Sequence, residues 1–285
     1  PLIGVRGGIA GDFTVTRLAE DEFMIIGSGM AERYHQRFWK MVPMPAGVSF
    51  ESLTEALCGF NVAGPKSRAL LQRLTNTSLA TEDFPFMRSK RIELAGVDCV
   101  ALRVSFTGDL GWELHCKTED QLRLYEALLD CAKDFDAGPV GARALMSLRV
   151  EKGYGSWSRE YSPEYWPQEV GLAGLIKLDK DFLHKEAYFA IKDKDPRERL
   201  CIVEILAPDH ADATGGEPIF DKAGAGVGRV TSGTYGYGVN KSLALCYLKN
   251  VTAGDELDVM ILGKPHHAIV LPEAPFDPKG EKLRA

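Results

Sequence analysis

The chain has 285 residues, of which 45% are hydrophobic and 26% are charged, and its formal net charge is -6. This length and composition predict a globular protein with more than one domain and a large buried core. The negative charge gives no general attraction to nucleic acid or to an anionic membrane, and no apolar run approaches the roughly 20 residues of a membrane span. Because the sequence begins at Pro1 within an apparent strand, we expect a fragment of a longer chain.

Residues 1–48 are predicted to form the remainder of one subdomain and begin with a glycine-rich motif, Arg6-Gly7-Gly8-Ile9-Ala10-Gly11-Asp12-Phe13-Thr14. Strands are predicted over residues 12–18 and 23–26, and a helix over residues 31–41. Alternation along the first strand places Asp12 and Thr14 on one face, where a carboxylate and a hydroxyl could exchange a proton. The structural alternative is a turn aspartate that only accepts hydrogen bonds from backbone amides.

Residues 49–192 are predicted to form a second α+β subdomain, with helices at 64–74 and 142–152. A hairpin is expected over 91–106, turning near Gly96. Thr118 and Gln121 suggest a capping box for a further helix that contains Leu122, Tyr125 and Leu129. Arg149 and Glu151 are interpreted as a structural pair on the last helix.

A second polar motif follows the hairpin, in the run Ser105-Phe106-Thr107-Gly108-Asp109-Leu110-Gly111-Trp112-Glu113. Thr107-Gly108-Asp109 is predicted to be a turn, after which Trp112 and Glu113 lie on opposite sides of a strand. A fixed carboxylate beside aromatic groups suits the edge of an amino-pyrimidine, because it accepts two N–H donors at once. The alternative for Glu113 is an exposed strand residue without a ligand.

The last block, residues 197–285, follows a charged stretch, 192–199, that is expected to be a solvated linker. Strands are predicted over 201–206, 217–220, 226–230, 242–248, 256–262 and 267–271, which indicates a small antiparallel barrel or sandwich. The glycine-rich run 224–228 precedes a strand pattern and not a helix. It is therefore interpreted as a hairpin turn and not as a nucleotide-binding loop.

The six cysteines form no CxxC pair, and the six histidines form neither HExxH nor HxxxH. We therefore expect reduced, buried thiols in a reducing compartment and no dedicated metal site.

Several motifs occur in an order that resembles the aminomethyltransferase, or glycine-cleavage T-protein, superfamily. Besides the two polar motifs they are Ala63-Gly64-Pro65-Lys66-Ser67-Arg68, Ser147-Leu148-Arg149-Val150-Glu151-Lys152-Gly153-Tyr154, Glu169-Val170-Gly171-Leu172 and Val230-Thr231-Ser232-Gly233. Gly155-Ser156-Trp157 and Thr234-Tyr235-Gly236-Tyr237-Gly238 resemble the C-terminal half of dimethylglycine and sarcosine dehydrogenases. The resemblance implies an α+β T-protein fold with a C-terminal antiparallel β-barrel.

The resemblance also implies roles for individual residues. Asp12 matches the aspartate that handles the proton at the folate nitrogens, Thr14 matches a residue that orients it, and Glu113 matches the glutamate that holds the pterin ring. Phe106 stands where many relatives have tyrosine. Leu145 stands where T proteins have an arginine that binds the folate tail. Arg143, two residues earlier, is the candidate substitute, and its alternative is a surface arginine without a ligand. Together with Trp112, these are the expected folate-binding residues.

The implied function is the capture of an oxidised methyl carbon as 5,10-methylenetetrahydrofolate, within a flavin-dependent N-methyl amino acid dehydrogenase. The expected cofactor of this chain is tetrahydrofolate, and FAD would belong to a flavin domain present in cis or as a separate subunit. The expected location is the cytoplasm of a bacterium or the mitochondrial matrix of a eukaryote. Two alternatives are open: a stand-alone aminomethyltransferase, and a non-catalytic folate-binding protein.

Overall fold

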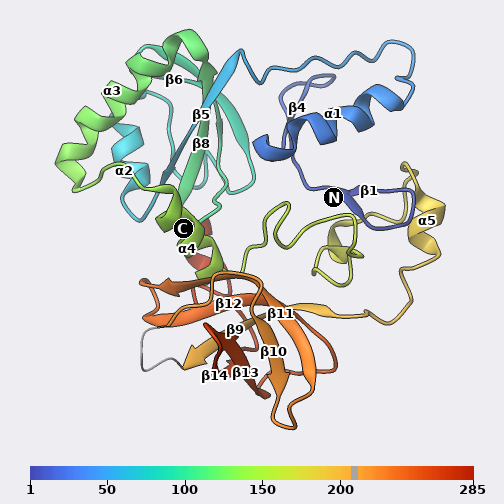
Figure 1. The fold of residues 1–285 in the computed structure, drawn as a ribbon. Helices are drawn as coiled ribbons and strands as arrows, with labels where there is room; N and C mark the ends of the chain where they lie inside the picture. The colour runs from blue at the N-terminus through green and yellow to red at the C-terminus, as the bar shows by residue number, and fades with distance from the viewer. Residues whose placement is uncertain (207–210) are drawn as a thin grey trace. The chain divides into compact units, whose positions relative to one another are not determined.

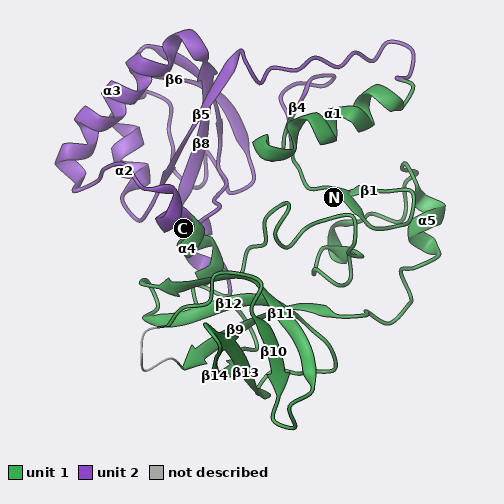
Figure 2. Cartoon of the chain, viewed as in Figure 1, with its two compact units in different colours: residues 1–15, 25–43, 146–278 green, residues 16–24, 44–145, 279–285 purple. Residues whose placement is uncertain are grey.

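The computed structural model describes residues 1–206 and 211–285, which divide into two compact units (Figure 2). Unit 1 comprises residues 1–15, 25–43 and 146–278, and unit 2 comprises residues 16–24, 44–145 and 279–285. The predicted mixed α+β class is confirmed. The boundaries of the three predicted subdomains stay a prediction.

Unit 2 is built on a four-stranded antiparallel sheet in the order β5-β8-β7-β6. Its strands are β5 (Leu57–Ala63), β6 (Ser89–Leu94), β7 (Val97–Leu102) and β8 (Gly111–Lys117). The helices α2 (Ser67–Gln72) and α3 (Gln121–Ala132) cover one face of this sheet (Figure 1). Because side chains alternate along a strand, every second residue of each strand enters the core beneath the helices, whereas the others form the opposite face.

Unit 1 contains a closed six-stranded barrel, as predicted. The strands are β9 (Arg199–Leu206), β10 (Pro218–Asp221), β11 (Gly226–Gly236), β12 (Lys241–Leu248), β13 (Glu256–Ile261) and β14 (Lys264–Val270). They follow the order β10-β11-β12-β9-β14-β13, and β13 pairs with β10 to close the barrel. The glycine-rich run 224–228 belongs to a hairpin, as predicted, but the turn ends before Gly226, where β11 begins, and Asp221 accepts hydrogen bonds from the amides of Ala223 and Ala225 in it.

The remaining elements are short. Two antiparallel pairs join β1 (Leu2–Ile3) to β2 (Ile9–Gly11) and β3 (Thr14–Arg17) to β4 (Phe23–Ile26). The helices are α1 (Glu32–Met41), α4 (Ala142–Glu151), α5 (Lys185–Phe189) and α6 (Glu281–Arg284). The division between the units falls within α4, after Leu145.

Two local predictions are wrong. The hairpin strand ends at Leu102 and does not reach Phe106, because the chain turns into the loop before β8. The capping box does not form, because the Thr118 hydroxyl donates instead to the carbonyl of Glu55. The predicted helix itself is confirmed as α3, and its buried residues are Leu124, Leu128 and Ala132.

The charged stretch before the barrel is also more than a solvated linker. The Arg197 guanidinium donates to the fully buried Glu169 carboxylate through Nε at 2.7 Å and through its terminal nitrogen at 2.6 Å. Burial alone would raise the pKa of Glu169, but the hydrogen bonds from Arg197 and from backbone amides lower it overall. Arg197 therefore fixes the entry to the barrel through a charge-assisted contact.

Candidate functional site

In unit 1, the Gly7-Gly8 pair allows the first strands to approach their neighbours closely. A Cβ atom on Gly7 would lie 2.7 Å from the Ala187 carbonyl oxygen, and one on Gly8 would lie 2.5 Å from the Pro163 carbonyl oxygen. Gly7 also has a φ of 81°, which favours glycine. Any larger residue at either position would displace the backbone around β2.

Asp12 follows β2 directly and lies in the two-residue break before β3. The prediction that Asp12 and Thr14 share a face of one strand is therefore wrong, because the strand begins only at Thr14. Burial raises the pKa of Asp12, and a hydrogen bond from the backbone of Phe13 offsets only part of this effect. A carboxyl group whose pKa is raised in this way holds its proton more readily than an ordinary aspartate, which suits a group that exchanges a proton with a ligand.

Tyr161 is a neighbour of Asp12 that the local sequence patterns did not predict. Its burial, followed by the negative charge of Asp12, raises the pKa of Tyr161 to about 12. The phenol is therefore protonated at neutral pH and can donate a hydrogen bond. Gly155 makes room for this ring, since a Cβ atom there would lie 2.6 Å from it.

An aromatic cluster surrounds the residue that follows Asp12. The ring of Phe13 packs edge-on against His35, with centroids 4.7 Å apart, and His35 packs in the same way against Trp157 at 4.7 Å. Tyr34 contacts both His35 and Trp157. His35 is buried, which lowers its pKa, so its imidazole is neutral at physiological pH.

The loop that carries Trp157 and Tyr161 is held by the buried carboxylate of Glu160. Glu160 accepts hydrogen bonds from Arg149 at 2.8 Å and from the amide of Ser156 at 2.9 Å. Its other oxygen accepts the hydroxyls of Thr231 at 2.8 Å and Ser232 at 2.6 Å. A bulge in β11 between Val230 and Ser232 lets these two consecutive side chains reach the same carboxylate.

The predicted pair between Arg149 and Glu151 on α4 is wrong, because Arg149 binds Glu160. Glu151 instead accepts the amide of Gly238 at 3.1 Å. A Cβ atom on Gly238 would lie 2.4 Å from the Glu151 carboxylate, which explains why glycine is required in this motif.

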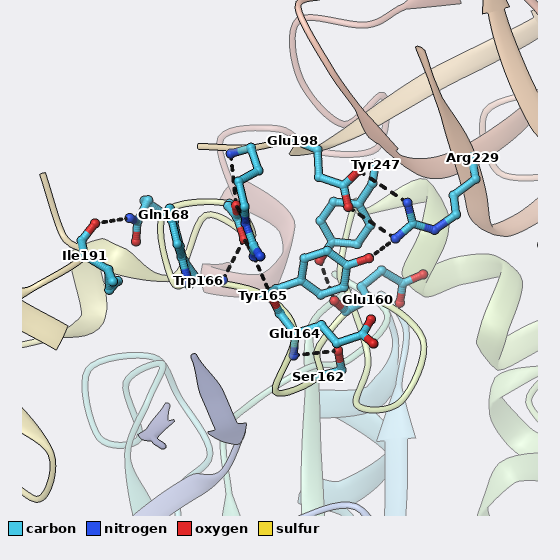
Figure 3. A network of polar contacts seen from close by, with 12 residues as sticks. Glu160, Ser162, Glu164, Tyr165, Trp166, Gln168, Ile191, Glu198, Arg229 and Tyr247 are labelled. Carbon is cyan, nitrogen blue, oxygen red and sulfur yellow. Dashed lines mark hydrogen bonds and ion pairs between the residues drawn. The ribbon is translucent and has the colours of Figure 1, made fainter. Parts of the chain in front are cut away.

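A second part of this network joins the loop to the barrel (Figure 3). The rings of Tyr165 and Tyr247 stack with centroids 3.8 Å apart and an interplanar angle of 6°. The Tyr247 hydroxyl donates to the Glu160 carbonyl oxygen at 2.5 Å, while Arg229 contacts both Tyr165 and Glu198. The loop beside Asp12 is thus fixed by side chains from two barrel strands, β11 and β12, and Glu198, directly before β9, pairs with Arg229.

In unit 2, Glu113 lies on β8 on the sheet face opposite the helices, and its side chain is 26% exposed. Its cross-strand partner on β5 is Asn61. Trp112 points the other way and is 0% exposed in the core, so its side chain is excluded from ligands in this structure. The prediction that Trp112 and Glu113 lie on opposite sides of a strand is confirmed.

The turn before β8 is ordered by its own hydroxyl groups. Ser105 Oγ accepts the amide of Gly108 at 3.1 Å, and Gly108 has a φ of 85°. Phe106, in this turn, is partly exposed, and Arg143 at the start of α4 is exposed. The structure therefore places Asp12 and Thr14 in unit 1, and Phe106, Glu113 and Arg143 in unit 2.

Other kinds of site are not evident in the described residues. Within residues 1–206 and 211–285, no group of three or more histidine, cysteine, aspartate or glutamate side chains is arranged to hold a metal ion. Among the helices of these residues, none combines the length and apolar character of a membrane span.

Two family models cover most of the chain. Residues 1–180 match the GCVT N-terminal domain, and residues 198–277 match the glycine cleavage T-protein C-terminal barrel domain. The chain therefore belongs to the glycine-cleavage T-protein family, and the resemblance inferred from its motifs is confirmed.

Relatives with known names include two kinds of protein. Mitochondrial dimethylglycine dehydrogenase of Homo sapiens is 33% identical over 95% of this chain and 32% of its own length. Mitochondrial sarcosine dehydrogenase of Homo sapiens is 28% identical over 99% and 33%, respectively. An aminomethyltransferase of Desulfitobacterium hafniense is 29% identical over 98% of this chain and 76% of its own length. The chain thus spans about a third of the dehydrogenases that it matches.

The glycine cleavage system aminomethyltransferase T of Bartonella henselae has a similar structure. Its TM-score is 0.79 at 24% identity, over 96% of this chain and 74% of that one. This similarity confirms the predicted fold.

Proposed function

We propose that this chain is the tetrahydrofolate-binding part of a flavin-dependent N-methyl amino acid dehydrogenase of the dimethylglycine or sarcosine type. The observation that carries the proposal is the similarity to dimethylglycine dehydrogenase over 95% of the chain. The enclosed Asp12 and the half-exposed strand glutamate Glu113 provide the acid–base and binding groups that such a function requires.

Glu113 is proposed to bind the pterin ring. Its carboxylate can accept the ring N–H and the exocyclic amino group together, which is a charge-assisted, bidentate contact. Thr14 is proposed to orient the folate, Phe106 to contact its ring, and Arg143 to bind the acidic tail. A flavin domain, in cis or as a separate subunit, would supply the oxidation of the N-methyl amine to an iminium ion.

Asp12 is proposed to relay protons during carbon capture. N5 of tetrahydrofolate attacks the iminium carbon and loses its proton, and N10 then attacks the same carbon, displaces the amine and loses its own proton. The amine takes up one proton as it leaves, so the products are 5,10-methylenetetrahydrofolate, the demethylated amine and one proton. Asp12 can accept a proton from a folate nitrogen and return it to the departing amine. The protonated Tyr161 beside it can stabilise the ionised carboxylate.

A stand-alone aminomethyltransferase is the second candidate. It is favoured by one observation: the chain covers 76% of the Desulfitobacterium aminomethyltransferase but only 32% of dimethylglycine dehydrogenase. The sequence that precedes Pro1 in the gene would separate the two, since a GxGxxG strand–turn–helix unit there would indicate a dinucleotide-binding flavin domain.

Titration calorimetry of the longest natural chain with tetrahydrofolate, under anaerobic conditions, tests the proposal. We expect saturable binding that Glu113→Ala weakens by about tenfold or more, since a charge-assisted hydrogen bond contributes about 1.5–3 kcal/mol. Glu93→Ala is the matched control, because Glu93 is an exposed carboxylate on strand β6 of the same sheet. Binding that does not saturate at millimolar ligand, or equal affinities for both variants, would contradict the proposal.

A further inference from the structure

The sheet face that carries Glu113 also carries a histidine. His115 follows Glu113 by two residues on β8, so alternation places both side chains on the face opposite α2 and α3. His115 Nε2 lies 3.6 Å from Glu113 Oε2, and the His115 side chain is only 15% exposed. This nitrogen is buried and has no hydrogen-bond partner among the described residues. A small movement would bring it into hydrogen-bond contact with the carboxylate.

The neighbouring strand holds the imidazole in place. His115 is in register with Gly59 of β5, and a Cβ atom on Gly59 would lie 3.2 Å from His115 Nδ1 and 3.3 Å from Cε1. The ring therefore rests against backbone at a position that a side chain would otherwise occupy. Gly59 has an ordinary strand conformation, so its lack of a side chain here provides space for the imidazole.

The other charged groups on this face are paired or distant in register. Alternation places Lys117 of β8, Asp98 of β7, and Arg91 and Glu93 of β6 on the same face, whereas β5 contributes only uncharged residues. Lys117 lies 3.6 Å from Glu119, and Arg91 forms a 2.8 Å pair with Glu22. His115 is therefore the group whose charge state most directly affects Glu113.

We infer that His115 is a positioning residue for Glu113 and that it takes up a proton when reduced folate binds. The inference rests on the proposed function, because it assigns the regulation of the same binding site. A pterin ring over Glu113 removes water from the carboxylate, and an ionised carboxylate without water needs a compensating partner. The ligand offers neutral N–H donors, so an imidazolium beside Glu113 supplies the missing positive charge.

Protonated His115 favours the complex, so the affinity for tetrahydrofolate should fall as the pH rises and the imidazole loses its proton. Replacement by glutamine keeps a hydrogen-bond donor but removes the charge. His115→Gln should weaken binding by about twofold to fivefold at pH 6, the scale of a partly exposed ion pair, and have less effect at pH 8.

Calorimetry in two buffers with different ionisation enthalpies measures proton uptake directly. We expect a substantial fraction of one proton per bound folate for the wild type near pH 7, and loss of this uptake in His115→Gln. Gly59→Ala, which displaces the ring, should reduce the uptake as well. His267→Gln is the matched control, because His267 Nε2 also lies near a carboxylate, 3.8 Å from Glu256, but in the barrel. Asp12→Asn controls for the other titrating group of the proposed mechanism.

The outcomes separate the two proposals. Saturable folate binding without proton uptake, or with uptake that persists in His115→Gln, would overturn the role of His115 and leave the proposed function intact. An absence of folate binding by the wild type would overturn both. A merely structural role for His115 would lower affinity equally at all pH values and leave the uptake unchanged.

Discussion

At the scale of single residues, Asp12 illustrates a conflict between enclosure and ionisation. Burial raises its pKa, so the folded protein holds this proton to a higher pH than the unfolded chain does. The ionisation of Asp12 therefore costs folding free energy. The cost begins as the pH rises above the unfolded value, near 3.8, and it is complete above the folded-state pKa. A site residue that destabilises the fold in this way is a common feature of functional sites.

Asp12→Asn should therefore raise the free energy of unfolding at neutral pH. The gain should shrink as the pH falls through the folded-state pKa, and it should vanish below the unfolded value, because both states are then protonated at Asp12. Urea unfolding over a pH series measures this dependence. Glu256→Gln, at an exposed barrel carboxylate, should show no comparable trend. A gain that is independent of pH would contradict burial as the cause.

The Arg149–Glu160 ion pair differs from Asp12, because each buried side chain has a partner of opposite charge. Their side chains are 1% and 0% exposed, respectively. Arg149→Met leaves the Glu160 carboxylate without its cation and should cost about 3–5 kcal/mol. The double variant Arg149→Met/Glu160→Leu should recover part of this loss. A double-mutant cycle in urea gives the coupling energy, and strictly additive losses would show that the two side chains act independently.

At the scale of elements, periodic patterns located most strands and helices correctly. The barrel strands were predicted from short alternating runs, because each strand has one face in the core. The helix α3 was located too, but its buried side is not evident from the pattern, because Leu122 and Tyr125 are apolar yet exposed. Which residues of α3 are buried depends on the side of the helix that meets the sheet. Because α3 has apolar residues on two sides, its sequence pattern does not identify that side.

The candidate site was predictable only where its residues lie in local motifs. Asp12 and Glu113 each follow or accompany a glycine-rich turn, so their motifs could be found in the sequence. Tyr161 comes from a segment far along the chain and His35 from the helix α1, and no local pattern links them to the Asp12 motif. The partner of Arg149 was missed for the same reason, since Glu160 lies in an irregular loop.

Two of the glycines in β11, Gly226 and Gly228, differ in how much space surrounds them. A Cβ atom on Gly228 would lie 1.9 Å from the Tyr247 carbonyl oxygen, whereas one on Gly226 would meet nothing closer than 3.9 Å. Gly228→Ala should therefore cost about 1–3 kcal/mol or more, as overpacking does. Gly226→Ala should change stability by less than about 0.5 kcal/mol. Thermal unfolding of both variants measures the difference, and equal losses would show that strand conformation, and not contact, requires these glycines.

At the scale of the whole molecule, the two units have separate hydrophobic cores. Asp12 belongs to unit 1 and Glu113 to unit 2, so the proposed proton-transfer and ring-binding roles are supported by different cores. Substitutions in one core should therefore impair one of these roles before the other. Both proposed roles are also distinct from the oxidation of the amine, which is proposed to take place in a separate flavin domain.

That separation gives a prediction for a full-length protein that carries a flavin domain. Asp12→Asn preserves the shape of the side chain but removes an acid–base group, whose contribution is typically about 10²–10⁴-fold. Flavin reduction by the N-methyl amine should be nearly unchanged, because the two half-reactions are proposed to use different sites. The formation of 5,10-methylenetetrahydrofolate should fall, and free formaldehyde should rise as the iminium ion is hydrolysed instead of captured. Stopped-flow measurement of flavin reduction, together with product analysis in the presence of folate, distinguishes these effects. If flavin reduction collapses while the product ratio stays normal, Asp12 acts in amine oxidation or in folding, and its role in carbon capture is wrong.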